Sequence, residues 1–320
     1  MATILSSFDE TSQVLKDRGT EIGINTIRSI THHYAQRAKV VQKGQQGSFK
    51  ETVSGCRVVA STDGGRIRIR KDKRGPKTKK GRNRYTTDWR EPKLLIIYTV
   101  NEKGEMDRSF CPFIEGTLKG PNAIFGLLKY YLGRLGIRKA DKILFVADGA
   151  HWIWNRVPEL IASLRISPNQ FYELVDLYHA VEHLGKAAAL RKGWKSSERT
   201  HWITKHRRLL LKGKVDKVIE AIGQICRGRR SKKLRRELNY FMRNRKRMLY
   251  STISGLGLPI GSGAMESAIR RVVNLRLKGA SIYWLRETAE AMLLLRSYYK
   301  SGRWNMLKKL TFSVQLGSVT

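Results

Sequence analysis

Three acidic residues stand at positions suited to catalysis in a chain with few acids. Asp63 and Asp148 each end an apolar stretch before a glycine, and Glu266 follows the Gly-Ser-Gly at 261–263. In an open α/β sheet, the carboxyl ends of strands form the crevice that binds ligands. These residues also have ordinary explanations. Asp-Gly is common in turns, and Glu266 suits the first turn of a helix that Ser262 caps, where it could also pair with Arg270.

Together the three acids predict a metal site. Two strand-end aspartates and a glutamate from a helix that returns to the sheet can converge on one point. Three carboxylates among cations suit hard divalent ions, and Mg²⁺ (or Mn²⁺) is the natural choice beside phosphate. Two ions about 4 Å apart can activate a water or a 3′-hydroxyl and stabilise the leaving oxygen of a phosphodiester.

The charge of the chain predicts a polyanionic partner. The 320 residues include 63 Lys+Arg and 26 Asp+Glu, a net charge of +37, while 41% hydrophobic residues provide a core and exclude a disordered basic tail. Nucleic acid is the usual partner of such an excess. A structural RNA-binding protein and a membrane-surface binder are the alternatives, and the first has no reason to place three acids at sheet ends.

Cysteines and apolar stretches predict the compartment. The three cysteines are far apart and form no C-x-x-C pair, which argues against a disulfide framework or a cysteine zinc site. MATILSSFDE lacks the features of a signal peptide, and stretches such as 94–100 are too short to span a membrane. We therefore expect a cytoplasmic, nucleoid-associated protein with no membrane partner.

The apolar pattern predicts a mixed α/β sheet flanked by helices. In chain order we expect strands at 56–63, 66–70 and 93–100, a polar loop at 71–90, a helix from Pro121 to Leu135, a strand at 142–147, a helix from Trp152, and a strand at 170–176. The final helices are expected at 264–277 and 283–300.

The chain is predicted to divide into four parts. An N-terminal helical segment, 1–50, contains either half of a helix-turn-helix or a plain capping helix, and is a DNA-binding remnant in the first case. The catalytic core comprises 51–176 and 256–304, and 305–320 is a C-terminal tail. Between the two core segments, 177–255 is a basic helical insertion, with 22 Lys+Arg and four acids between residues 186 and 247.

A resemblance to a known family follows from these features. The order of elements, with Asp after the first strand, Asp after the fourth and Glu on a late helix, resembles the RNase H-like DDE transposases. Four strings resemble bacterial insertion-sequence transposases of the ISKra type: VASTDGGRIRIR, LFVADGAHWIWNRV, DLYHAVEHL and GSGAMESAIRRVVNLRLKGASIYWLRETAEAMLLLRSYYKSGRW. The resemblance covers residues 50–304. It implies an RNase H-like five-stranded mixed sheet with an all-α insertion before the last catalytic helix, and Asp63, Asp148 and Glu266 as the metal-binding triad.

Asp176 and His179 form a separate motif. They resemble the [C/D]-x-x-H element of several transposase groups, which implies an accessory role beside the active site. His179, Glu182 and His183 also match the H-x-x-E-H zinc-protease pattern. No third ligand is recognisable and a protease has no use for the charge, so we expect His179 near the DNA and His183 partly buried in its helix.

Basic and aromatic residues around the acids are the expected DNA contacts. The segment 66–93 holds 13 Lys+Arg and follows the Asp63 strand directly, so it is expected to contact phosphates beside the scissile bond. Trp152 is expected either to stack on an unpaired base or to pack in its helix. The DNA-binding candidates are Arg66, Arg68, Arg70, Lys71, Trp152, Arg270, Arg271 and Lys278.

The resulting hypothesis is a DNA transposase that uses two Mg²⁺ or Mn²⁺ ions. Water would free a 3′-OH at the element ends, and the 3′-OH would attack double-stranded target DNA. Asp63 would bridge the metals, Asp148 would hold them, and Glu266 would complete the second site. Two DNA ends must be held, so a homodimer is expected. The alternatives are an RNase H-like nuclease or resolvase and a domesticated, non-catalytic DNA-binding protein.

Overall fold

A five-stranded mixed sheet forms the centre of the protein. The computed structural model describes residues 1–44, 49, 51–227, 231–280 and 282–312. The strand order is β5-β4-β1-β6-β7, and the strands are β1 (Arg57–Gly64), β4 (Lys93–Val100), β5 (Phe113–Thr117), β6 (Lys142–Ala147) and β7 (Phe171–Val175). β1, β4 and β5 pair antiparallel, whereas β6 and β7 run parallel to β1. The predicted mixed α/β sheet flanked by helices is confirmed.

Helices cover the sheet and also form the N-terminal segment, the bundle and the end of the described chain. The helices are α1 (Phe8–Asp17), α2 (Ile24–Gly44), α3 (Pro121–Arg134), α4 (His151–Trp154), α5 (Val157–Leu164), α6 (Leu177–Ala189), α7 (Ser196–Leu211), α8 (Val215–Cys226), α9 (Lys232–Asn244), α10 (Tyr250–Gly255), α11 (Gly263–Ile269), α12 (Arg286–Lys300) and α13 (Trp304–Phe312). Short turns of helix lie at η1 (Ile137–Lys139), η2 (Pro168–Gln170), η3 (Arg245–Arg247) and η4 (Arg270–Asn274).

The central strands are fully enclosed. Every residue of β4 is buried, because α3 packs against β4 and β5 while α11 packs across β1 and β4. A strand that is covered in this way needs a continuous apolar run rather than an alternating one, and LLIIYTV provides it. No helix in the described part of the chain is long and apolar enough to cross a membrane.

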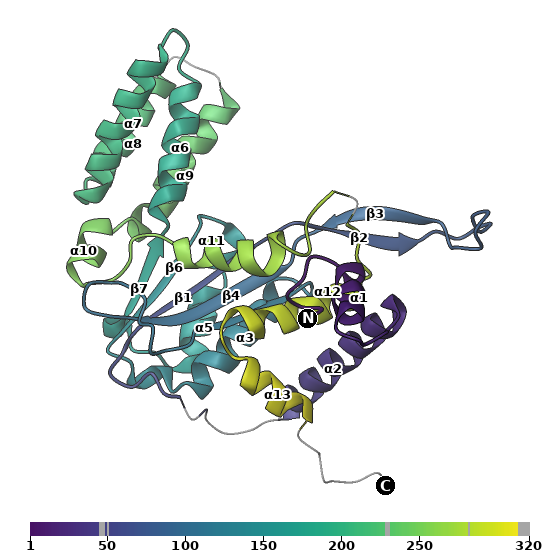
Figure 1. The fold of residues 1–320 in the computed structure, drawn as a ribbon. Coiled ribbons are helices and arrows are strands. Elements are labelled where there is room, and N and C mark those ends of the chain that lie inside the picture. Colours follow the sequence, from purple (N-terminus) through teal and green to yellow (C-terminus); the bar gives the residue numbers. More distant parts are fainter. Residues whose placement is uncertain (45–48, 50, 228–230, 281, 313–320) are drawn as a thin grey trace.

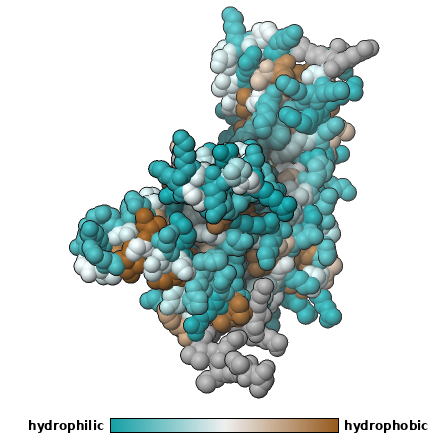
Figure 2. Space-filling view, turned by 90° about the vertical axis from the view of Figure 1, so that its right-hand side faces the viewer, coloured by the Kyte–Doolittle hydropathy of each residue, from teal (hydrophilic) through white to brown (hydrophobic). Residues whose placement is uncertain are grey.

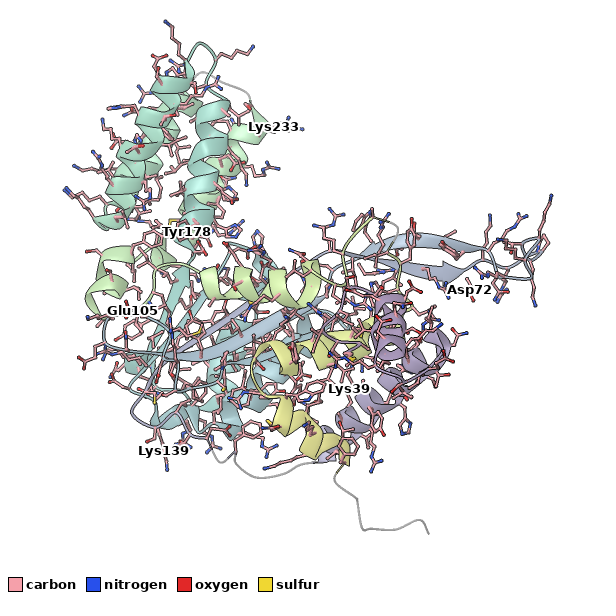
Figure 3. The ribbon with its side chains drawn as sticks, viewed as in Figure 1. Lys39, Asp72, Glu105, Lys139, Tyr178 and Lys233 are labelled. Carbon is pink, nitrogen blue, oxygen red and sulfur yellow. The ribbon has the colours of Figure 1, made fainter. Side chains whose placement is uncertain are left out.

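The basic insertion is an upright helical bundle. Helices α6 to α9 stand together at one end of the sheet, and α10 leads back to α11 (Figure 1). Val218, Ile222 and Phe241 of the bundle are buried and belong to the same continuous hydrophobic core as the sheet. Long side chains project from its flanks, as Lys233 does, while Tyr178 marks its root (Figure 3). The helical character predicted for this segment is therefore observed.

The polar loop predicted at 71–90 is wrong in part. Residues 85–90 form β3 (Tyr85–Arg90), which pairs antiparallel with β2 (Ile67–Asp72) in a separate two-stranded sheet. This hairpin projects sideways from the body (Figure 1). Ile67 and Ile69 anchor its base in the core, and the backbone of Trp284 bridges to Ile69. Mostly exposed residues form β3, so no apolar alternation marks it.

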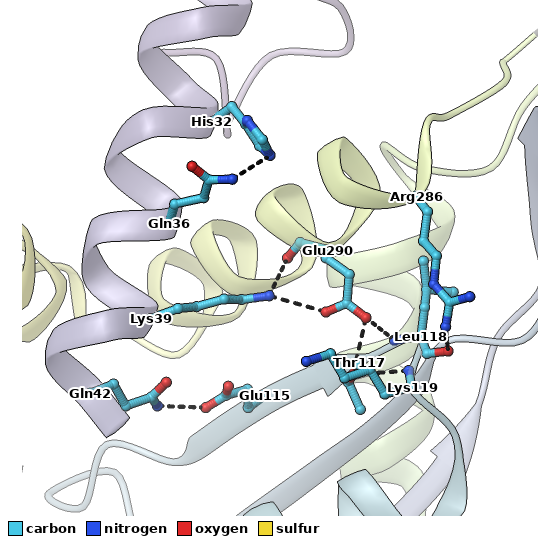
Figure 4. Close-up of polar contacts among 10 residues, drawn as sticks. All are labelled: His32, Gln36, Lys39, Gln42, Glu115, Thr117, Leu118, Lys119, Arg286 and Glu290. Carbon is cyan, nitrogen blue, oxygen red and sulfur yellow. Dashed lines mark hydrogen bonds and ion pairs between the residues drawn. The ribbon is translucent and has the colours of Figure 1, made fainter. Parts of the chain in front are cut away.

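The ends of the chain pack on the body. The tail predicted from residue 305 instead begins within α13, which shares a small core with α2 and α12 through Leu307, Leu310, Ala35, Ala38 and Leu294; residues 313–320 lie outside the described part. Figure 4 shows how α2 is held: Lys39 Nζ lies 3.1 Å from Glu290 Oε2, and Gln42 donates to Glu115 at 2.9 Å. The predicted helix near 22–40 is thus a docked helix, consistent with a capping helix.

The two final helices differ from their predicted bounds. The first is α11 followed by the π-helical turn η4, and the second is α12, which begins at Arg286 rather than at Tyr283. Tyr283 and Trp284 precede α12 because the Trp284 N–H donates to Arg68 O while the Arg70 N–H donates to Trp284 O. Pairing with the base of the hairpin therefore keeps these two residues outside the helix, and α12 begins after them.

Candidate active site

Asp63 and Asp148 lie side by side at the ends of neighbouring parallel strands. β1 and β6 are paired in register through Ala60 and Phe145, and each aspartate lies three residues beyond its member of this pair. The ladder ends at this pair, and beyond it the acids are still close enough for the charge of Asp148 to act on Asp63. The structure therefore brings together the two acids that the sequence placed at strand ends.

The environment of Asp63 raises its pKa to about 6. Burial is the main cause, and the charge of Asp148 adds to it, while the Gly64 N–H that donates to Asp63 and the nearby His179 and Lys93 oppose it. Burial and a like charge both disfavour the ionised carboxyl. Asp63 is thus a desolvated carboxyl, and a cation would relieve its repulsion from Asp148.

The backbone after Asp148 is fixed from two sides. Asp148 Oδ1 accepts from the Ala150 N–H at 3.0 Å, and the Trp154 indole donates to Asp148 O at 2.6 Å. From α9, Arg243 donates to Gly149 O at 2.9 Å. A Cβ at Gly149 would overlap the Tyr240 ring, so the bundle packs directly on the loop that carries Asp148.

Glu266 lies on α11 but stands apart from the aspartates. Its side chain is exposed and makes no hydrogen bond or ion pair with the described residues, so the predicted pairing with Arg270 is not observed. α11 itself crosses β1 and β4. Among the described residues, no three His, Cys, Asp or Glu side chains are close enough to hold a metal ion. The three predicted acids therefore form no three-ligand metal cluster in the structure.

Asp176 is buried and ties two helix starts together. It directly follows β7, where its Oδ1 accepts from the N–H groups of Tyr178 and His179 at 2.5 and 3.2 Å. Its Oδ2 accepts from the Ser262 N–H at 2.6 Å and from the Ser262 hydroxyl. Ser262 was predicted to cap α11 with its side chain; instead, that hydroxyl is given to Asp176. Asp176 thus fixes the start of the helix that carries Glu266.

The two histidines of α6 have different surroundings. His179 is partly exposed and its charge lowers the pKa of Asp63, so it lies near that aspartate. His183 is half-buried: its Nδ1 lies 2.5 Å from Glu237 Oε2, and its ring stacks on Tyr240 at 3.6 Å. Burial lowers the pKa of His183, although Glu237 opposes the shift. Of the H-x-x-E-H pattern, His183 therefore packs α6 against α9 inside the bundle.

Lys93, the last cation of the basic segment 66–93, is buried near Asp63, and its burial was not predicted. Its side chain is 6% exposed, and its Nζ lies 2.6 Å from Glu91 Oε1 and 3.9 Å from the centre of the Trp152 ring. Trp152 also packs edge-on against Phe125, so this expected DNA contact is partly engaged in packing. A lysine that opens an otherwise apolar strand was the available signal.

The hairpin presents its predicted cations with aromatic rings. Arg66 and Arg68 lie over the exposed Trp89 at 5.3 and 5.6 Å, and Arg70 lies over Tyr85 at 5.7 Å. Lys71 pairs with Asp88 at 3.4 Å. The side of the molecule toward which the hairpin points is mostly hydrophilic, with separate hydrophobic patches (Figure 2). Such a surface suits a polar, anionic partner.

The remaining predicted contacts follow α11. Arg270 and Lys278 are exposed, whereas Arg271 donates to the carbonyls of Ser267 and Lys300 at 3.3 and 3.2 Å. Figure 1 shows α11 between the bundle on one side and the hairpin on the other. The acids thus lie among basic elements that come from three separate parts of the chain.

Comparison of the chain with protein-family models, with curated proteins and with solved structures found no match in any of the three. The chemical capacity of the site therefore has to be judged from its residues. Two adjacent carboxylates, a nearby imidazole and a surrounding excess of cations can bind a divalent metal and a phosphate together.

Proposed function

We propose that this protein is a DNA transposase of the DDE type. The observation that carries the proposal is the placement of Asp63 and Asp148 level with each other, at the carboxyl ends of adjacent parallel strands, in a chain with a net charge of +37. Such strand ends are where open α/β sheets bind their ligands. Paired acids inside a basic surface fit an enzyme that acts on DNA.

The order of the elements supports an RNase H-like core. Asp63 lies at the end of the first strand of the five-stranded sheet, Asp148 follows the fourth, and Glu266 lies on a late helix after the helical bundle. This is the arrangement expected from the resemblance to insertion-sequence transposases. The topology and the local strings therefore favour the same family.

The acids fit a divalent metal. Asp63 and Asp148 offer hard oxygen donors, and their mutual repulsion is the kind of cost that Mg²⁺ or Mn²⁺ removes. These two residues would hold the metal, and Glu266, exposed and unpaired within the described part of the chain, would complete the site. Two bound ions would supply activation of the attacking oxygen and stabilisation of the leaving oxygen.

The remaining residues of the site position the proposed metal ligands and neutralise negative charge. Asp176 holds the α11 start through Ser262, and Lys93 places a buried positive charge near Asp63. The hairpin and the bundle would contact the phosphates of the element ends and of the target DNA. Because two ends must be joined, the proposed assembly is a homodimer, and the proposed location is the nucleoid.

The test is a plasmid assay with purified protein and Mg²⁺ or Mn²⁺. The substrate carries the DNA that flanks the coding region, and nicked and joined products are separated on gels. We expect both products from the wild type and neither from Asp63→Asn or Asp148→Asn. Nicking without joined products would favour the nuclease alternative. Persistent metal-dependent nicking by Asp148→Asn would overturn the assignment of the site.

A further inference from the structure

A second arginine-rich site lies at the base of the hairpin, away from the acids. An open cavity of about 310 Å³ is lined by residues of α1, the start of α2, β2 and the segment before α12. Arg28, Arg70 and Arg276 line it, and Asp9 is the one acid among its lining residues. A cavity of this size is typical of a site for a small ligand group.

Arg276 is buried in this cavity without the partners that a guanidinium needs. The residue is 4% exposed, and its Nε and Nη2 have no hydrogen-bond partner among the described residues. The guanidinium lies 5.1 Å from the ring centres of both Phe8 and Trp284. Burial lowers the pKa of Arg276 to about 10, opposed by Glu10. A buried cation with free donors is costly unless an anion completes it.

Two more arginines belong to the same site. The Nε of Arg70 is also buried and unpartnered within the described part of the chain. Arg28, which is exposed, lies 5.8 Å from the Phe8 ring and therefore shares this ring with Arg276. Three guanidiniums from three segments thus surround one cavity, and guanidiniums are well matched to phosphate oxygens.

The cavity continues along the hairpin. A second cavity, of about 880 Å³, is also lined by Arg28 and Arg70 and extends to Lys79, Lys80 and Arg82 near the hairpin tip. The two spaces therefore share a wall and form a basic groove between the hairpin and the N-terminal helices. Tyr85, 44% exposed, lies in the same groove and offers an aromatic face.

We propose that this groove binds the phosphate backbone of a DNA strand, with one phosphate held by Arg28, Arg70 and Arg276. The inference rests on the proposed function in taking DNA as the ligand. It also gives the N-terminal helices a role: they form one wall of the groove while they remain docked on the body. A linear array of cations with an aromatic ring is suited to a backbone rather than to an isolated anion.

Arg28→Gln and Arg70→Gln test the groove without disturbing the buried Arg276. Binding of a fluorescein-labelled DNA duplex would be measured by anisotropy over a series of salt concentrations. Each variant should bind about fivefold more weakly, and the slope of log K against log salt should fall by about 0.9 for each lost phosphate contact. The matched control is Arg138→Gln, which removes an exposed arginine of η1 and should bind within about twofold of the wild type.

Phenylglyoxal footprinting of the wild type provides a second measurement. Bound DNA should protect Arg28 and Arg70 from modification and leave Arg138 reactive. The groove proposal would be overturned if the variants bind DNA with the affinity and salt slope of the wild type. It would also be overturned if Arg28 and Arg70 stay reactive in the complex, even if catalysis depends on Asp63. Conversely, loss of binding in Arg28→Gln combined with nicking that does not require Asp148 would retain the groove and reject the catalytic proposal.

Discussion

Replacing Asp176 with asparagine should destabilise the protein strongly, although this residue touches no proposed metal ligand. The carboxylate is fully buried and accepts from three backbone N–H groups and one hydroxyl. In Asp176→Asn the amide oxygen can replace only one carboxylate oxygen, so the amide NH₂ faces the Ser262 N–H. A buried unsatisfied donor costs about 1–3 kcal/mol, and hydrogen bonds to a charged group contribute about 1.5–3 kcal/mol. We therefore expect a loss of about 3–5 kcal/mol.

Urea unfolding followed by circular dichroism would measure this loss. Asp216→Asn is the matched control, because Asp216 is exposed and its pairing with Arg245 is a surface ion pair worth at most about 1 kcal/mol. Ser262→Ala, which removes one of the four donors, should cost about 1 kcal/mol. A loss below about 1 kcal/mol for Asp176→Asn would refute the idea that this carboxylate joins the two helix starts.

Three further changes test other parts of the structure. The pKa of Asp63, about 6, lies above its ordinary value of 3.8, so ionisation of Asp63 destabilises the metal-free fold as the pH rises toward 6. In EDTA, Asp63→Asn should therefore raise the free energy of unfolding in urea by at most about 3 kcal/mol at pH 8 and by about half of that at pH 5. A gain that does not depend on pH would contradict this. Gly149→Ala should lose about 1–3 kcal/mol because of Tyr240, whereas Gly126→Ala, in open space on α3, should gain up to about 1 kcal/mol; equal thermal shifts would argue against the close packing. Leu307→Ala should cost about 2–4 kcal/mol in chemical unfolding if α13 belongs to the core, and a neutral result would restore the predicted tail.

The sheet and its acids could be predicted because their signals are local. Continuous apolar runs such as 94–100, which are too short to span a membrane, have one good explanation, namely enclosed strands. A polar residue that ends such a run lies at the carboxyl end of its strand. This reasoning placed Asp63, Asp148 and Asp176 correctly. The helix from Pro121 was equally clear, since its apolar residues recur with helical spacing.

Features that depend on partners distant in the sequence could not be predicted. β3 has both faces largely exposed, so only its pairing with β2 defines it as a strand. Trp284 has the spacing of the following helix, but backbone hydrogen bonds to the hairpin hold it outside that helix. The unpaired atoms of Arg276 appear only when α1, β2 and the segment before α12 come together. In each case tertiary contacts override a local pattern.

The most direct test of the central claim is Mn²⁺ binding, followed by electron paramagnetic resonance of the free ion. If Asp63 and Asp148 hold the catalytic metal, the wild type binds Mn²⁺ and Asp148→Asn loses affinity by more than the roughly 10–100-fold typical of losing an outer-shell partner. Asp216→Asn, the exposed control, should bind as the wild type does. Undiminished Mn²⁺ binding by Asp148→Asn would contradict the assignment of these strand-end acids as a metal site.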